Sequence, residues 1–348
     1  MAFKYLIDIV GGCNLACPSC PVGNSTEAAR PSGAMSVDLF KAIIAKIRAD
    51  QPRVRKVALY NWTEPMLHPR LPQFIDIVHG AGLKVDISSN LNIAKHLEPT
   101  IGASPDGFRV SISGFSQETY ERTHLLGDVE VVKHNMRDIR EAIDRTGAKT
   151  RVEVCYHCYV DNIGSEYQEM ERLARELDFD FSPVWAYLMP IEKVLDRLNG
   201  VTADEDRAVI DLLAIKPEEQ RDLAIRRPAA DCRLRAKQTV INCDGSVPLC
   251  CTVFDSRYTI APSFLDQGHE ELQRSKYEHP LCTECMGHGL HETFAYRGAD
   301  EWHPVAQRRV APQGVPKELG PSVGRRWKGA IQRTKKRIAA FGREDSSR

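Results

Sequence analysis

The chain has 348 residues, which is enough for one large α/β domain and a smaller one. Hydrophobic residues make up 42% of the chain, charged residues make up 27%, and the formal net charge is zero, so the balance gives no reason to expect a nucleic-acid partner. No run approaches the roughly 18 consecutive apolar residues of a membrane span, and the N-terminus lacks the ordered segments of a secretory signal. We therefore expect a cytoplasmic protein in a reducing environment.

Short apolar runs alternate with helical patterns along the first 200 residues. The pattern predicts strands at 5–10, 54–60, 83–88, 108–112, 151–159 and 181–188, and helices after an N-cap at Ser36 and at 71–80, 93–97, 129–145 and 165–177. Such alternation is typical of parallel βαβ units with right-handed crossovers. About six units are too few to close an eight-stranded barrel. The expected fold class is α/β, with a partial (β/α)6 TIM-like barrel over residues 1–200.

The composition changes in the last third of the chain. Residues 201–229 read as a helical connector, and residues 230–300 hold six of the cysteines with little alternation of strands and helices, as a small separate domain would. Residues 301–348 end in a basic tail. The tail is either an amphipathic helix that touches anionic lipid or a partner, or an ordinary solvated or docked terminal helix.

Eleven cysteines stand out in an otherwise ordinary composition. In a reducing compartment such clusters indicate metal ligands or catalytic thiols rather than disulfides. Cys13, Cys17 and Cys20 form a C-x3-C-x2-C run directly after the first expected strand. Three thiolates on one loop can each bind a different iron of one cubane and leave the fourth iron open. An open coordination position is the mark of a catalytic metal site. The alternative is a zinc site or scattered core thiols, and the nearest histidine in sequence is His68.

This spacing after a first barrel strand resembles the radical S-adenosylmethionine (SAM) superfamily. The resemblance implies a [4Fe–4S] cluster whose open iron chelates SAM, and a 5′-deoxyadenosyl radical that abstracts hydrogen from the substrate. It also implies SAM contacts at the ends of later strands, where barrel active sites lie. In the run Asn61-Trp62-Thr63-Glu64-Pro65, the residues Asn61 and Glu64 match a turn that binds the methionine amino group. The other implied contacts are Ser88, Ser89, Asn90, Ser111, Ser113 and Asn162. The chain departs from the family at Ser19, where an aromatic residue beside the adenine is common.

A second set of cysteines follows the connector. Twelve residues separate Cys232 from Gly245, four more separate Gly245 from Cys250, and Cys282-Thr-Glu-Cys285 lies downstream. Gly245 fits the turn of a hairpin between 239–242 and 247–250. The spacing resembles the auxiliary domains called SPASM and, in shortened form, twitch. It implies a second [4Fe–4S] cluster bound by Cys232, Cys250, Cys282 and Cys285. Structural zinc on these cysteines, or with His288 and His291, stays open.

The remaining cysteines have weaker signals. Cys251, beside Cys250, is either a hydrogen-atom donor to a substrate radical or a core thiol. Cys155 and Cys158 lie three apart on an expected strand, so they face opposite sides and do not share a metal. Cys243 belongs to the expected hairpin.

Three functions remain possible from the sequence. The first is oxidation or epimerisation of a small polyol, such as a sugar, an aminocyclitol or a sugar nucleotide, with an external one-electron donor of the flavodoxin or ferredoxin type. The second is modification of a peptide or protein. It is disfavoured because the first strand starts by Tyr5, which leaves no room for a peptide-docking module before it. The third is a non-catalytic iron–sulfur electron-transfer protein. Trp62, Tyr156, His157, Trp185 and Tyr187 are pocket candidates that core packing would equally explain.

Overall fold

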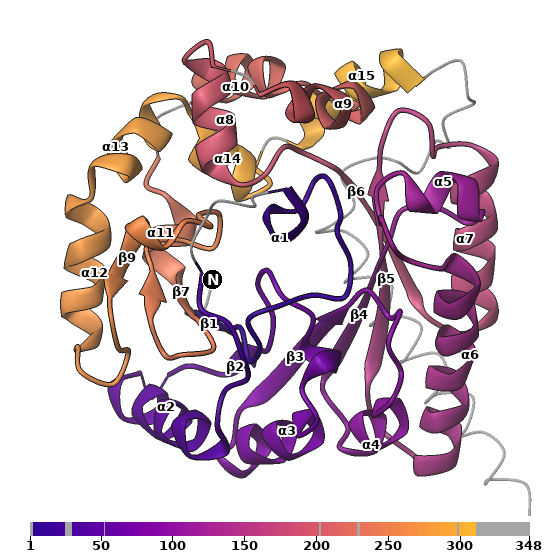
Figure 1. Ribbon diagram of the computed structural model, residues 1–348, viewed down its shortest axis with the longest axis vertical. Helices are drawn as coiled ribbons and strands as arrows, with labels where there is room; N and C mark the ends of the chain where they lie inside the picture. The colour runs from indigo at the N-terminus through magenta and orange to yellow at the C-terminus, as the bar shows by residue number, and fades with distance from the viewer. Residues whose placement is uncertain are drawn as a thin grey trace, which may run out of the picture.

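A computed structural model describes residues 3–24, 30–51, 53–201, 203–227, 230–297 and 299–310 (Figure 1). Most of the expected basic tail, residues 311–348, lies outside this part of the chain. Its role as a lipid-binding or docked helix stays a prediction, as do the expected domain boundaries. Among the described residues, no helix combines the length and apolar character needed to cross a membrane.

A seven-stranded parallel sheet forms the centre of the molecule, in the order β6-β5-β4-β3-β2-β1-β7. Its strands are β1 (Lys4–Ile7), β2 (Lys56–Ala58), β3 (Lys84–Ser89), β4 (Gly107–Ile112), β5 (Arg151–Cys158), β6 (Asp180–Trp185) and β7 (Gln238–Ile241). The strands curve around a central space in Figure 1, and β6 and β7 are the unpaired edges. The predicted α/β class and the open, partial barrel are therefore confirmed.

Helices cover the outer face of the sheet. They are α2 (Val37–Asp50), α3 (Leu71–Gly80), α4 (Leu97–Gly102), α5 (Gln117–Glu121), α6 (Val129–Thr146) and α7 (Ser165–Glu176), while the short α1 (Pro21–Asn24) lies over the central space (Figure 1). The apolar strand positions pack against them, and Phe40 of α2 stacks on Phe74 of α3 with ring centroids 4.2 Å apart. Each such fully buried side chain contributes roughly 1.5–3 kcal/mol to stability. The opposite strand positions, which face the central space, are largely polar.

Local signals placed most helix boundaries. The Oγ of Ser36 accepts a hydrogen bond from Leu39 N at 3.1 Å, which confirms the predicted N-cap of α2. The helix expected at 93–97 is wrong, because α4 begins only at Leu97. Pro99 has no N–H to donate within a helix, so it fits the first turn and sets this later start.

The predicted hairpin between 239–242 and 247–250 is also wrong. β7 instead pairs in parallel with β1, with Lys4 opposite Gln238 and Ile7 opposite Ile241. The next strand, β8 (Val247–Pro248), pairs antiparallel with β9 (Thr259–Ala261). The turn itself exists, since Gly245 has a φ of 88° and Asn242 N donates to Ser246 O at 2.9 Å. β7 satisfies the N–H and C=O groups of β1 that would otherwise form an open edge, and so adds a seventh strand to the expected six.

The rest of the described chain is mainly helical. α8 (Ile191–Leu198) precedes the expected connector, and within 201–229 the chain forms α9 (Asp204–Leu212) and α10 (Pro217–Ile225), so this segment is helical as its pattern predicted. The cysteine-rich part adds α11 (Arg233–Lys237), α12 (His269–Glu278), α13 (Pro280–Gly287), α14 (Leu290–Phe294) and α15 (Ala299–Val310). Figure 1 shows α12 and α13 beside β7 and β9, and α8, α10 and α14 between the two edges of the sheet.

Candidate functional site

The first cysteine run lies on the loop between β1 and α1, at the carboxyl edge of the sheet. Leu15 N and Asn90 Nδ2 each donate to the Sγ of Cys13 at 3.5 Å, and Cys20 N donates to Cys17 O at 3.0 Å. Burial raises the pKa of Cys20 to about 12, and the charge of Cys13 adds to the rise. Burial also raises the pKa of Cys17, and the charges of Cys20 and Cys13 add to that rise. The three thiols therefore lie within electrostatic range of one another on one loop, and binding to separate irons of one cluster would neutralise their thiolates.

The close packing of α1 against this loop depends on a glycine. A Cβ at Gly23 would overlap backbone atoms of Ala16 and Cys17, whereas a Cβ at Gly12 would meet nothing within 4 Å. Ala16 N also donates to Leu125 O at 3.1 Å, which ties the loop to the segment after α5. The conformation of the cysteine loop is thus fixed by contacts on both sides.

A buried aspartate holds the turn at residues 61–64. The carboxylate of Asp8, only 1% exposed, accepts hydrogen bonds from the backbone N–H groups of Asn61, Trp62 and Thr63 at 2.8, 3.2 and 3.4 Å. Glu64 N donates to Gly12 O at 3.0 Å, so the same turn also touches the cysteine loop. The amide nitrogen Nδ2 of Asn61 is buried without a hydrogen-bond partner among the described residues. A buried donor of this kind needs an acceptor, and a ligand carboxylate or carbonyl would supply one.

Glu64 performs a structural task. Its Oε1 accepts from Met66 N at 2.9 Å and its Oε2 accepts from Asn90 N at 2.8 Å. Burial raises the pKa of Glu64 to about 7, and these two hydrogen bonds oppose the rise. The carboxylate links the 61–64 turn to the end of β3, where Asn90 reaches Cys13 and the Oγ of Ser89 accepts from Leu91 N at 2.9 Å.

The other predicted contact residues divide into two groups. Ser88 and Ser111 face the central space on adjacent strands, with their Oγ atoms 3.4 Å apart. Ser113 and Asn162 are buried and satisfied by the protein. Asn162 Nδ2 donates to Ser113 O at 2.6 Å and to His157 O at 2.7 Å, and its Oδ1 accepts from Tyr159 N at 2.8 Å. A direct contact of Asn162 with a ligand would require these bonds to break.

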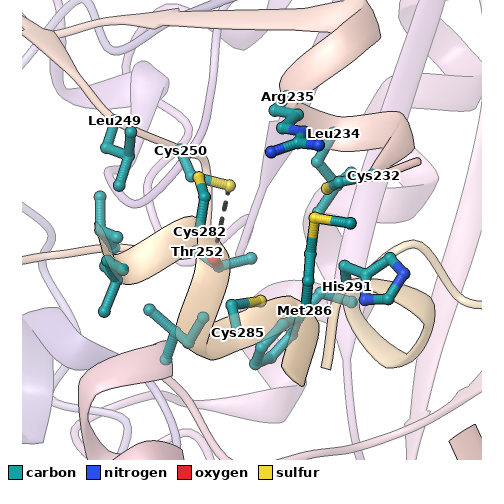
Figure 2. Close-up of a pocket in the computed structure, with 14 residues that line it drawn as sticks. Cys232, Leu234, Arg235, Leu249, Cys250, Thr252, Cys282, Cys285, Met286 and His291 are labelled. Atoms are coloured by element: carbon teal, nitrogen blue, oxygen red, sulfur yellow. Dashed lines mark hydrogen bonds between the residues drawn. The ribbon is translucent and has the colours of Figure 1, made fainter. Parts of the chain in front are cut away.

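The second set of cysteines surrounds a pocket in the C-terminal part (Figure 2). Cys232 comes from the N-cap of α11, Cys250 from the turn after β8, and Cys282 and Cys285 from α13. About 390 Å³ of space lies among the lining atoms, open solvent at the mouth included. The fold therefore gathers four cysteines that are 53 residues apart in the sequence from first to last.

Two adjacent cysteines face different spaces. Cys250 lines the pocket and its Sγ accepts from Thr252 Oγ1 at 3.5 Å, whereas Cys251 packs with Leu6, Ala58 and Val240 on the inner side of the barrel. Interaction between the two neighbouring thiols lowers the pKa of Cys250 and, with burial, raises the pKa of Cys251. Cys250 is thus suited to bind a metal as a thiolate, and Cys251 keeps its S–H.

The spacing of donors bears on the zinc alternative. Within the described residues, no three His, Cys, Asp or Glu side chains come close enough together to hold one metal ion. Of the two histidines considered as zinc ligands, His291 lines the pocket but its Nε2 lies 3.1 Å from Ala230 O, and His288 is not part of the lining.

Comparisons with known proteins identify the barrel. The family model described as the Radical SAM superfamily matches residues 7–177. Residues 7–177 form a radical SAM domain. No curated protein sequence matches the chain.

Solved radical SAM enzymes share the fold at low sequence identity. The structure of anSMEcpe with bound AdoMet is 13% identical, with a TM-score of 0.54, and the match covers 92% of this chain and 97% of that one. SuiB from Streptococcus suis, bound to S-adenosylmethionine, is 13% identical, with a TM-score of 0.52 over 82% of this chain and 68% of that one. BtrN in complex with AdoMet and 2-DOIA is 13% identical, with a TM-score of 0.45 over 83% of this chain and 89% of that one.

Within the radical SAM domain, sequence reasoning missed a set of charged residues on the inner strand face. Lys56 and Asp86 form an ion pair on β2 and β3, and Arg109 and Glu153 form another on β4 and β5. The signal was present, because these residues occupy the polar positions of alternating strands and Arg109 lies opposite Glu153 in the register. Of the pocket aromatics, Tyr156 and Trp185 belong to the buried outer core instead.

The departure at Ser19 has a local explanation in the fold. The Ser19 Oγ lies 3.0 Å from the hydroxyl of Tyr159, directly after β5. An aromatic residue from the fifth strand therefore stands beside the third cysteine, although the sequence has none at the preceding position.

The buried side chain of His124, near the cysteine loop of the radical SAM domain, should make the stability of the fold depend on pH. The Nδ1 of His124 lies 2.7 Å from Ser113 Oγ, its ring stacks on Tyr120, and burial lowers its pKa to about 3. Because the unfolded histidine titrates near 6.5, its contribution to stability is complete above that pH and is lost as the pH falls toward 3. We expect the free energy of unfolding to fall by about 2 kcal/mol more in the wild type than in His124→Phe between about pH 7 and pH 5.

Urea unfolding of the reconstituted protein at the two pH values measures this difference. His134→Phe is the control, since the His134 side chain is 74% exposed on α6. A wild-type slope in His124→Phe would contradict the prediction.

Proposed function

We propose that this protein uses a [4Fe–4S] cluster on Cys13, Cys17 and Cys20, together with SAM, to abstract a hydrogen atom from a small polyol such as a sugar, an aminocyclitol or a sugar nucleotide. The outcome is oxidation to a ketone or epimerisation. The observation that carries the proposal is the position of Cys13, Cys17 and Cys20 together on one loop at the carboxyl edge of an open barrel whose inner face is largely polar. Polar strand positions with paired donors and acceptors suit hydroxyl groups.

Bound there, the cluster and SAM would supply the 5′-deoxyadenosyl radical. Asn61 would offer its unpartnered Nδ2 to the methionine part of SAM, and Asp8 and Glu64 would hold the turn that presents it. Asn90 would orient Cys13. Ser88 and Ser111 would present hydroxyls at the same edge, while Ser89, Ser113 and Asn162 would act by fixing the strand ends.

The second cluster is proposed for Cys232, Cys250, Cys282 and Cys285. One zinc ion holds its thiolates at about 2.3 Å around one point, whereas a cubane binds each thiolate to a separate iron. Four cysteines around one pocket, and the lack among the described residues of any three donors placed for one ion, support the cubane. This cluster would take up the electron released when the substrate alcohol is oxidised, while the hydroxyl proton goes to solvent. In epimerisation, Cys251 would return a hydrogen atom, and an electron from an external flavodoxin- or ferredoxin-type donor with a proton from solvent would restore its thiol.

The buried Lys276 should affect the reduction potential of this second cluster. Lys276 is 1% exposed, donates to Gln238 O at 2.6 Å and Thr239 Oγ1 at 2.9 Å, and has no acidic partner among the described residues. Burial lowers its pKa to about 8, and Cys250, Cys251, Cys282 and Cys232 oppose the shift, so Lys276 lies within electrostatic range of the second set of cysteines. A buried cation favours the more negative, reduced state of a cluster. Lys276→Met is therefore expected to make the reduction potential of the second cluster more negative.

A redox titration followed by electron paramagnetic resonance measures that potential. Lys237→Met, on the exposed side of α11, removes a lysine nearby and should leave the potential unchanged. An unchanged potential in Lys276→Met with full iron content would show that the second cluster does not lie beside this lysine.

Peptide modification is the second candidate, because solved structures of the same fold include anSMEcpe with a bound Cp18Cys peptide and SuiB bound to its precursor peptide SuiA. An anaerobic screen that follows release of 5′-deoxyadenosine separates the two. Stimulation by a sugar or aminocyclitol supports the first proposal, and stimulation by peptides alone overturns it.

A further inference from the structure

Arg109, in the middle of β4, has donors that the protein does not use. Its Nε donates to Glu153 Oε2 at 3.1 Å, and Ser182 Oγ donates to Glu153 Oε1 at 2.6 Å. Among the described residues, neither terminal nitrogen of Arg109 has a hydrogen-bond partner, although the side chain is only 40% exposed. The guanidinium therefore keeps up to four N–H donors available inside the barrel.

Arg109 lies within electrostatic range of groups near the carboxyl ends of the strands. Arg109 influences the pKa of Tyr187 and of His157, which lie at or beyond the ends of β6 and β5. Cys251 and Cys155 influence the same Tyr187 hydroxyl. Arg109 and Cys251, on separate elements, are thus both within electrostatic range of Tyr187.

A neighbouring ion pair shows what a purely structural contact looks like here. Lys56 Nζ lies 2.8 Å from both carboxylate oxygens of Asp86, so each partner of this ion pair uses the other to satisfy its charge. Arg109 instead engages Glu153 with Nε alone, and Ser182 holds the carboxylate from its other oxygen. This arrangement fixes the plane of the guanidinium and leaves the opposite edge of the fork open.

We propose that Arg109 binds an anionic group of the substrate, a carboxylate or a phosphate, through its two terminal nitrogens. The inference rests on the proposed function and narrows its substrate class to acidic or phosphorylated polyols. A planar guanidinium gives two parallel hydrogen bonds to either group. Held there, the carbon skeleton of the substrate lies beside Tyr187 and Cys251, which is where a hydrogen-atom donor is needed.

The test measures binding to anaerobically reconstituted enzyme in the presence of SAM. Isothermal titration calorimetry compares three probes of similar size: glucose, which is neutral, glucuronate, which carries a carboxylate, and glucose 1-phosphate. We expect at least one anionic probe to bind about tenfold or more tightly than glucose, because hydrogen bonds to an ionised group are stronger than those to a neutral hydroxyl. Arg109→Gln should abolish that preference, and Arg109→Lys should restore only part of it.

Controls separate this inference from the proposed function. Arg172→Gln removes an arginine whose side chain is 65% exposed on α7 and should retain the preference. Iron content reports whether the Arg109 variants are folded and loaded. The inference is overturned if neither anion binds the wild type better than glucose does, or if Arg109→Gln keeps the preference. Reductive SAM cleavage by the wild type without any probe is measured separately, and its absence would count against the radical function instead.

Discussion

Simultaneous replacement of Cys13, Cys17 and Cys20 by alanine is expected to remove one of two clusters and all SAM cleavage. Wild type should hold about eight irons per chain after anaerobic reconstitution, and the variant about four, because each cubane contains four. The three thiols are the side chains that the loop after β1 gathers at the carboxyl edge, and Asn90 and Leu15 donate hydrogen bonds to the first of them. Without them, SAM has no iron to chelate, so release of 5′-deoxyadenosine should fall to background.

The control removes cysteines that have no proposed metal. Cys155→Ala with Cys243→Ala deletes two buried thiols outside both sets and should keep about eight irons. Iron and zinc are both counted. About four irons and one zinc in the wild type would mean that the C-terminal cysteines bind zinc, and the electron-acceptor role would then fail. Retention of about eight irons by the triple variant would place the first cluster elsewhere.

Local patterns were sufficient for most of the barrel. The strand and helix alternation of the first 200 residues gave the class and the open sheet, because period-2 and period-3.6 patterns are local properties. β7 was missed since its partner, β1, lies more than 230 residues away, and a four-residue apolar run fits a hairpin as well as a sheet edge. Gly245 correctly marked a turn, yet a turn does not decide which strands pair across it.

The candidate site shows the same division. Spacing alone grouped Cys13, Cys17 and Cys20, because neighbours on a short loop must be close. Spacing could not show that the side-chain amide of Asn162 donates to backbone carbonyl groups. It also could not show that Cys250 lines the C-terminal pocket while Cys251 packs inside the barrel. These depend on tertiary packing around each side chain. The hydrogen bonds of Asp8 and Lys276 could not be predicted from the sequence either, since both residues bind partners that are distant in sequence.

Gly23→Ala is expected to remove the first cluster without touching a cysteine. The new Cβ would overlap backbone atoms of Ala16 and Cys17, which are not the ends of flexible side chains and cannot move aside cheaply. Either α1 or the loop must shift, and the three thiols then no longer meet one cubane. The variant should hold about four irons and release little 5′-deoxyadenosine.

Gly12→Ala is the matched control in the same loop, because a Cβ there meets nothing within 4 Å and should leave about eight irons. Equal iron loss in both variants would mean that any added methyl disturbs the loop. Full loading of Gly23→Ala would mean that α1 is not required for cluster binding. Loss in Gly23→Ala alone would show that the position of the cysteines, and not only their identity, is fixed by the contact between α1 and the loop.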